Sequence, residues 1–238
     1  MTLMELVNSL RLRLDDYGGN TGTPPGGYTH YYEYADSGCL WTNEELVRLL
    51  NDARHELCRR VPIVDSTSAV TLVSLDAGHS EAGLDPCILA IRRVYNLTDG
   101  FVLAKTAHQF ETPEILSRAV ACSTYLENLD DFVLTVFGPA LQRTELQLTV
   151  ERLPALPLLW EDRYSEDDEV PAQSQSALIE YAAHLAWLKN DSDTYSAEKS
   201  ALALQIFDRL IGPSRSAADL RRTKNLAGRA WHCHPSFM

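Results

Sequence analysis

The chain has 238 residues, of which 45% are hydrophobic, and carries a formal net charge of −12. This composition is sufficient for a packed core and excludes wholesale disorder, while the acidic balance opposes binding to nucleic acid by charge alone. The apolar runs are far shorter than the roughly 20 residues that span a bilayer, and the first residues carry acids instead of an apolar signal core. We therefore expect a soluble, unexported protein without a membrane contact.

The five cysteines give an odd count and contain no CxxC pair. This pattern argues against a disulfide framework and against a structural zinc ribbon. The sequence predicts reduced, mostly buried thiols at Cys39, Cys58, Cys87, Cys122 and Cys233.

The first predicted helix covers residues 2–16, where leucines recur at helical spacing with charges between them. A long segment rich in Gly, Pro, Asn and Thr follows, and these residues disfavour regular structure. Because this loop is unusually long for a compact domain, we expect it to be functional, with tyrosines that pack or bind a partner. The tyrosines are Tyr28, Tyr31, Tyr32 and Tyr34.

The second predicted helix begins near residue 43 and ends before Pro62. Thr42 is a favoured N-cap residue, and Glu45, three residues later, completes a capping box. A regular apolar face along this segment supports the helix.

After Asp65 the pattern changes to β-rich runs bounded by turn residues. Asp99-Gly100 gives a strong signal for a two-residue hairpin turn. Residues 107–121 could hold a short helix after Pro113. The β-rich runs are AVTLVSL, ILAIRRVYNL, FVLAKT, FVLTVF and TELQLTVERL.

Helical periodicity returns from Gln173, and a last helix ends at Gly212-Pro213. The order of helices, strands and helices predicts an α+β fold, in which N- and C-terminal helices pack as a helical bundle with an inserted antiparallel β module. The expected parts are 1–64, the N-terminal helices with the Gly/Tyr-rich loop; 65–160, the β module; 161–213, an acidic linker and the C-terminal helices; and 214–238, a basic C-terminal arm.

Glu180 and His184 lie four residues apart on one predicted helix, a spacing that permits joint metal ligation. Two ligands are too few for a site, and Asp191 and Asp193 fall at the end of the helix, where acids commonly cap or solvate a turn. A metal-dependent hydrolase using Glu180, His184 and Asp191 or Asp193 is therefore one alternative, and ordinary helix packing is the favoured interpretation. No nucleophile elbow or phosphate-binding glycine loop occurs, so we expect no catalytic residue, no cofactor and no metal.

The C-terminal segment is basic around Arg221, Arg222 and Lys224, and it ends in a Trp231-His232-Cys233-His234 run. Adjacent ligands at a chain end do not easily converge on one tetrahedral ion, so contact with a neighbouring protein is favoured over a metal site. A nucleic-acid-binding accessory factor is a second alternative, but the segment lacks interleaved aromatic platforms.

Five segments resemble parts of the adaptor, or head-to-tail connector, proteins of tailed bacteriophages. SLRLRLDD followed by LWTNEELVRLLNDARHELCRRVPIVD is similar to the opening of that family, and IRRVYNLTDGFVLAKT resembles its hairpin. FVLTVFGPALQRTELQLTVERLP resembles its closing strands, and ALIEYAAHLAWLKNDSDTYSAEKSALALQIFDRLIG is similar to its last two helices. The GGNTGTPPGGYTHYYEYADSG insertion departs from the family pattern.

The resemblance implies a structural virion protein and not an enzyme. Such a protein forms a ring, typically twelvefold, that docks beneath the portal, offers a platform to tail or nozzle proteins, and lets genomic DNA pass through without specific binding. It implies a location at the capsid–tail junction of the virion, after assembly in the host cytoplasm. The expected contacts with the portal or a neighbouring subunit are Arg215, Arg221, Arg222, Lys224, Arg229, Trp231 and Phe237, with the tyrosine loop as a second candidate.

Overall fold

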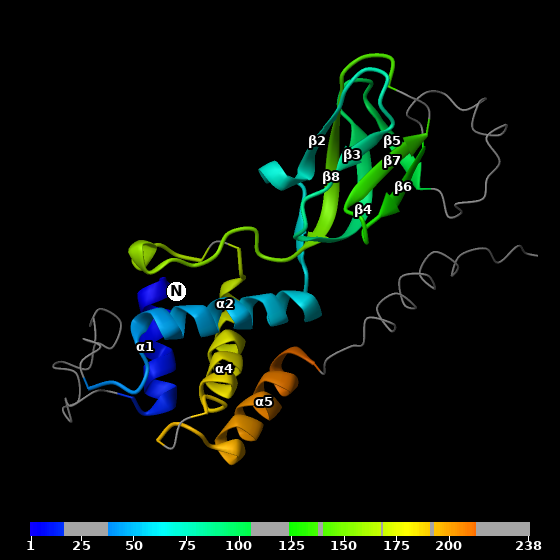
Figure 1. Ribbon diagram of the computed structural model, residues 1–238. Helices are drawn as coiled ribbons and strands as arrows, with labels where there is room; N and C mark the ends of the chain where they lie inside the picture. The colour runs from blue at the N-terminus through cyan, green and yellow to red at the C-terminus, as the bar shows by residue number, and fades with distance from the viewer. Residues whose placement is uncertain (17–37, 106–123, 138–139, 168, 191–192, 213–238) are drawn as a thin grey trace, which may run out of the picture.

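The computed structural model describes residues 1–16, 38–105, 124–137, 140–167, 169–190 and 193–212. Within these residues the chain forms four α-helices and an eight-stranded sheet, which extended segments connect (Figure 1). The helices are α1 (Leu3–Leu14), α2 (Asn43–Arg60), α4 (Gln175–Ala186) and α5 (Ala197–Ile211).

Side-chain caps set the starts of the first two helices. Thr2 caps α1 and Thr42 caps α2, and each forms a reciprocal capping box with a glutamate three residues later, Glu5 or Glu45. A capping box satisfies N–H groups that the first helical turn leaves unpaired. The predicted cap and limits of the second helix are thereby confirmed, as is the end of α5 at Gly212, where φ is 103°.

The four helices share one apolar core, and α4 packs against each of the other three. Its buried face carries mainly alanines, and their small side chains let neighbouring helices approach closely. The helix α2 lies across α1 and α4, whereas α5 covers the side of α4 that faces away from α1 (Figure 1). The buried side chains at these crossings include Leu6, Leu10, Leu46, Leu50, Leu178 and Phe207.

The sheet is mixed, and its strands follow the order β1-β8-β4-β5-β6-β7-β3, with β2 also paired to β8. All pairs are antiparallel except β5 and β6, which run parallel. The strands are β1 (Ile63–Asp65), β2 (Leu72–Leu75), β3 (Glu81–Gly83), β4 (Ile88–Asn96), β5 (Phe101–Lys105), β6 (Thr124–Asn128), β7 (Val133–Phe137) and β8 (Thr144–Arg152).

The sheet curls around its own core into a half-barrel. Register shifts in β4, between Ile88 and Ala90 and between Ile91 and Arg93, mark irregularities that increase twist and bend a strand. Every second residue of β8, from Thr144 to Arg152, is buried. Side chains of β2 and β3, near opposite ends of the sheet, enter the same apolar core.

This arrangement corrects the fold class expected from the sequence. A helical bundle with an inserted antiparallel β module is wrong, because the β region is a curled, mixed eight-stranded sheet, and α2 runs across α1 and α4 instead of along them. The parallel β5–β6 pair has a physical reason. Residues 106–123 separate these strands, and a connection of a dozen or more residues lets two strands run in the same direction.

The predicted hairpin between β4 and β5 is confirmed, but its loop is longer than predicted. Asn96 pairs with Phe101, so four residues, 97–100, form the turn instead of two. The side chain of Asn96 accepts a hydrogen bond from the Asp99 N–H at 2.9 Å, and Gly100 adopts a φ of 76°. The short helix expected within 107–121 lies outside the described residues.

Candidate functional site

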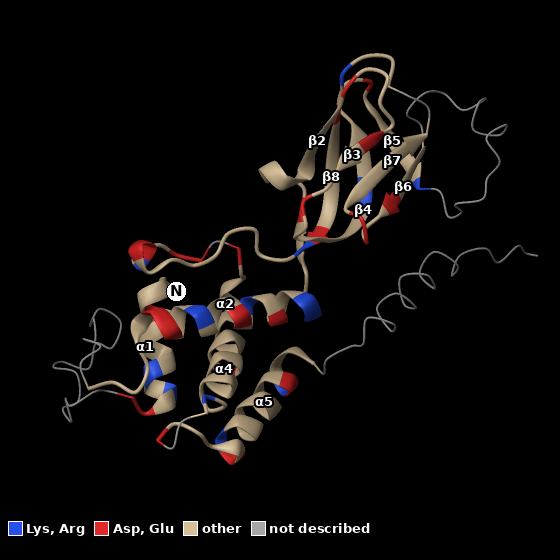
Figure 2. Ribbon diagram, viewed as in Figure 1, with Lys and Arg blue, Asp and Glu red and all other residues tan. Residues whose placement is uncertain are grey.

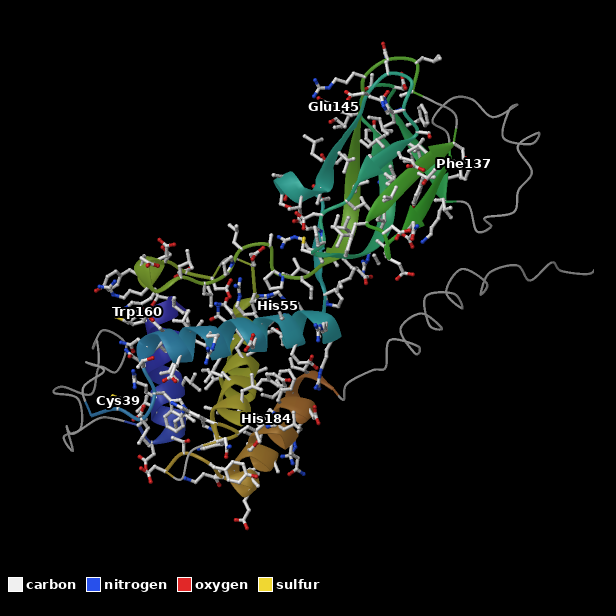
Figure 3. The ribbon with its side chains drawn as sticks, in the orientation of Figure 1. Cys39, His55, Phe137, Glu145, Trp160 and His184 are labelled. Atoms are coloured by element: carbon white, nitrogen blue, oxygen red, sulfur yellow. The ribbon has the colours of Figure 1, made fainter. Side chains whose placement is uncertain are left out.

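Glu180 and His184 both lie on α4 but bind different neighbouring helices. The carboxylate of Glu180 accepts hydrogen bonds from Nε and Nη2 of Arg13 on α1, each at 3.0 Å. Nδ1 of His184 lies 2.8 Å from Oγ of Ser200 on α5, and Figure 3 shows the histidine on the side of α4 near α5. The two side chains therefore fix α4 between its neighbours and do not converge on a common ligand.

Of the two aspartates of the suspected metal site, the structure describes only Asp193. Asp193 is exposed in the corner before α5, and Asp191 lies outside the described residues. Across the part of the chain that the structure describes, no three His, Cys, Asp or Glu side chains gather as a metal site requires. Helix packing thus accounts for Glu180 and His184, and nothing in their geometry supports the hydrolase alternative.

A largely buried ionic network, which the sequence did not predict, connects the helices with the sheet. Arg54 of α2 donates from Nη2 to Asp167 at 2.9 Å and to Glu169 at 3.1 Å. Arg152, at the end of β8, donates to the other oxygen of Glu169 at 2.5 Å and to Asp65 of β1 at 2.7 Å. Glu169 thus bridges an arginine of the helices and an arginine of the sheet. We refer to these five residues as the ionic joint.

Hydrogen bonding holds two carboxylates of the ionic joint in the charged form. Burial by itself raises the pKa of Glu169, but hydrogen bonds from Arg152 and the Ala155 N–H outweigh it and lower the pKa overall. Burial likewise opposes ionisation of Asp65, yet hydrogen bonds from Ser68, Thr67 and Arg152 bring its pKa well below the ordinary value. Such bonds favour the ionised form, so Asp65 and Glu169 are charged at neutral pH.

The segment after β8 lies along α2 and is held there by side chains of that helix. Arg54 also donates to the Leu156 carbonyl at 3.0 Å, and Asn51 exchanges hydrogen bonds of 2.8 and 3.0 Å with the backbone of Leu158. Figure 2 shows acidic residues along this connection to α4. The ionic joint and these bonds together set how the sheet meets the helices.

Two of the described cysteines, Cys58 and Cys87, are not activated nucleophiles. Burial raises the pKa of Cys58 to about 11, although the positive charge of Arg54 opposes this shift. Burial and a hydrogen bond to Asp85 raise the pKa of Cys87 to about 12. Since the thiolate is the reactive form, both thiols are poorly reactive at neutral pH. This agrees with the structural role expected for them.

Two surface grooves border α2. The larger, of about 240 Å³, lies between the start of α2 and the end of α4. The smaller, of about 210 Å³, lies between α2 and the segment around Trp160, which Figure 3 labels. Neither groove was anticipated from the sequence, because each combines residues from segments far apart in the chain.

The partner contacts expected from the sequence lie outside the described residues. They comprise the tyrosine loop and the basic C-terminal arm, and the structure tests neither. The residues concerned are Tyr28, Tyr31, Tyr32, Tyr34, Arg215, Arg221, Arg222, Lys224, Arg229, Trp231 and Phe237.

Comparison with protein families decides which class of protein this is. The family model described as SU10 adaptor protein matches residues 1–229, nearly the whole chain. The chain belongs to the SU10 adaptor protein family. Membership confirms the resemblance to phage head-to-tail adaptors, and it makes this chain a phage structural adaptor.

Membership in the SU10 adaptor family implies a place at the capsid–tail junction of the virion and contacts with portal and tail components. No curated protein matches the chain. Among the residues that the structure describes, every helix is too short or too polar to cross a membrane.

Proposed function

We propose that this adaptor forms a ring, typically twelvefold, beneath the portal of a tailed phage, joins the capsid to the tail, and surrounds a channel for genomic DNA. The observation that carries the proposal is the family match over residues 1–229. The protein would assemble in the host cytoplasm and remain in the virion as a structural component.

The charge of the chain suits a channel through which DNA slides. A net charge of −12 per subunit, repeated around a ring, repels phosphate instead of gripping it. DNA would therefore pass without specific binding to the wall. Association with the portal would instead depend on protein contacts.

Each part of the chain would have its own role in the assembled ring. Residues 1–64 and 161–213 would form the wall of the ring, and residues 65–160 would offer a platform to tail proteins. The arm of residues 214–238 would bind the portal or a neighbouring subunit through charge pairing and aromatic anchors. The anchors would be Trp231 and Phe237, with basic contacts from Arg215, Arg221, Arg222, Lys224 and Arg229; the tyrosine loop, with Tyr28, Tyr31, Tyr32 and Tyr34, would supply a second contact.

Mixing the purified adaptor with the portal protein of the same phage tests the proposal. Full-length protein should sediment with the portal at a fixed ratio, and a chain ending at residue 213 should bind much more weakly. Replacing the four loop tyrosines by serine tests the second contact separately. If the full-length chain never binds the portal, the adaptor role proposed here is wrong; if truncation changes nothing, only the arm assignment fails.

A further inference from the structure

The larger groove on the helices has an apolar floor that opens to solvent. We call it the α2/α4 groove, and its floor is formed by Trp41, Leu49, Leu185, Ala186 and Leu188. Its volume is about 240 Å³, and Leu188 at its edge is 46% exposed. A cavity of about 150 Å³ is enough to hold a benzene ring, so the groove has room for a leucine side chain.

Two polar groups beside the groove, on Trp41 and Arg48, have no partner among the residues that the structure describes. Trp41 is 2% exposed, yet its Nε1–H meets no hydrogen-bond acceptor within the described part of the chain. Arg48 is exposed at the rim and forms no ion pair with any described residue. The neighbouring Lys189 is already paired with Glu45 at 2.9 Å. An occupant that brings an acidic group and an acceptor would satisfy both unpartnered donors.

The outer side of α5 carries apolar side chains that match the floor of the groove and an acidic group that matches Arg48. Leu202, Ile206 and Leu210 recur every fourth residue and form a row that we call the α5 stripe. Leu202 and Leu210 are 53% and 52% exposed. Glu198, one turn before Leu202, is also exposed, and its carboxylate has no ion-pair partner among the residues described. Residues four apart share a helical face, so Glu198 extends the stripe with a negative charge.

We propose that the α2/α4 groove of one copy receives the α5 stripe of a second copy, with Leu202 in the groove and Glu198 paired with Arg48. The proposal rests on the ring proposed above and names the contact between its neighbouring subunits. Burying Leu202 removes apolar surface from water on both sides, and the carboxylate gives the guanidinium an opposite charge.

The positions of the two surfaces suit a contact that repeats around a ring. In Figure 1, α1 and the start of α2 lie on one side of α4, and α5 lies on the other. One copy therefore carries both halves of the contact on different sides, as a head-to-tail interface requires. In an isologous dimer, by contrast, both subunits would contribute the same surface patch to the interface.

Reversing the charge of Arg48 or of Glu198 tests each side of the proposed contact. Arg48→Glu and Glu198→Lys each place like charges at the interface, so each variant alone should assemble with its portal at least about tenfold more weakly than the wild type. The double variant, and an equimolar mixture of the two single variants, should recover association because opposite charges meet again. Native mass spectrometry would count adaptor subunits per portal, and sedimentation velocity without portal would follow self-association.

Two control variants match the charge changes at sites away from the contact. Glu81→Lys reverses an exposed glutamate of β3, in the sheet and away from the helices that form the contact. Arg143→Glu reverses an exposed arginine between β7 and β8. Both should assemble like the wild type. Circular dichroism and thermal unfolding would establish that each tested variant is folded.

The outcomes distinguish this contact from the adaptor role itself. The contact is supported if both single variants bind the portal more weakly and if the double variant and the mixture bind it as the wild type does. Equal loading of wild type and both single variants on the portal overturns the contact but leaves the adaptor role standing. If the wild type never binds the portal, the adaptor role is wrong. The contact is then tested by self-association alone, which should be weaker in both single variants and restored in the double variant and the mixture.

Discussion

The helical core and the ionic joint are stabilised by different forces, although they share the helix α2. Leu50 of α2 is fully buried among apolar side chains, whereas Arg54, one turn later, is buried among carboxylates. Apolar burial is insensitive to pH, but a buried ion pair depends on the charge of both partners. Acid should therefore weaken the connection between helices and sheet before it weakens the helices themselves.

This difference suits a subunit whose two parts face different partners. The core keeps the helices together, and the joint fixes the direction of the sheet relative to them. A charged joint specifies one arrangement, because each arginine must find its own carboxylates. An apolar contact at the same place would let the sheet shift relative to the helices, because apolar attraction is not directional.

The largest expected effect comes from removing one side of the ionic joint. Arg54→Met leaves Asp167 without the arginine that compensates its buried charge and removes one of the two arginines bound to Glu169, so the free energy of unfolding should fall by about 3–5 kcal/mol at pH 7. Urea denaturation followed by circular dichroism measures this change. The matched control Arg48→Met, on the exposed side of the same helix, should change stability by about 0.5 kcal/mol or less. Equal effects of the two variants would refute the role of the joint.

Removing apolar volume from the helical core should have a comparable or smaller effect that does not depend on pH. Leu50→Ala should lower the free energy of unfolding by about 2–5 kcal/mol, because it loses buried surface and leaves a cavity. The loss should be the same at pH 7 and pH 4.5. A loss that varied strongly with pH would show that the core and the joint are not energetically separate.

Acidification should weaken the joint by protonating its carboxylates. Asp65 and Glu169 have ordinary pKa values of 3.8 and 4.5, and both are lowered in the folded chain. Their contribution is therefore present above the unfolded pKa and is lost as the pH falls through the folded pKa. The wild type should lose on the order of 2 kcal/mol relative to Asp65→Asn between about pH 5 and pH 2, since the variant cannot titrate there. Parallel pH profiles for the two proteins would contradict this assignment.

The smallest effect concerns the cap of α2. Thr42→Ala removes the side-chain oxygen that accepts the Glu45 N–H at 3.1 Å, and should cost about 1 kcal/mol. Thr42→Ser keeps the acceptor and should be nearly neutral. Thermal unfolding of both variants measures the difference, and an equal loss in both would mean that the hydroxyl does not stabilise the helix.

The sequence predicted those features that depend on neighbouring residues. Thr42 and Glu45 located the start of α2, Gly212 located the end of α5, and alternation along β8 revealed a long strand. The strands β1, β3 and β6 were missed, since IVD and EAG are only three residues long and TYLEN has polar residues in place of the continuous apolar run that revealed β5 and β7. The predicted fold class was wrong because hairpin signals favour antiparallel neighbours and say nothing of the β5–β6 pairing.

The ionic joint could not be predicted, because its partners are far apart in the chain. Arg54 and Asp167 are separated by 113 residues, and a lone arginine on a helix usually points to solvent. A weak signal was present in the acidic run at 161–169, which was interpreted as a linker. Two of its members, Asp167 and Glu169, instead bind arginines from α2 and β8.

Electron microscopy of the complex between this adaptor and its portal tests the central claim most directly. The account predicts a closed ring of adaptor subunits bound to the portal and coaxial with its channel, with helices forming the wall and the sheet directed toward the tail. A portal that carries no adaptor ring when mixed with folded, full-length protein would contradict it.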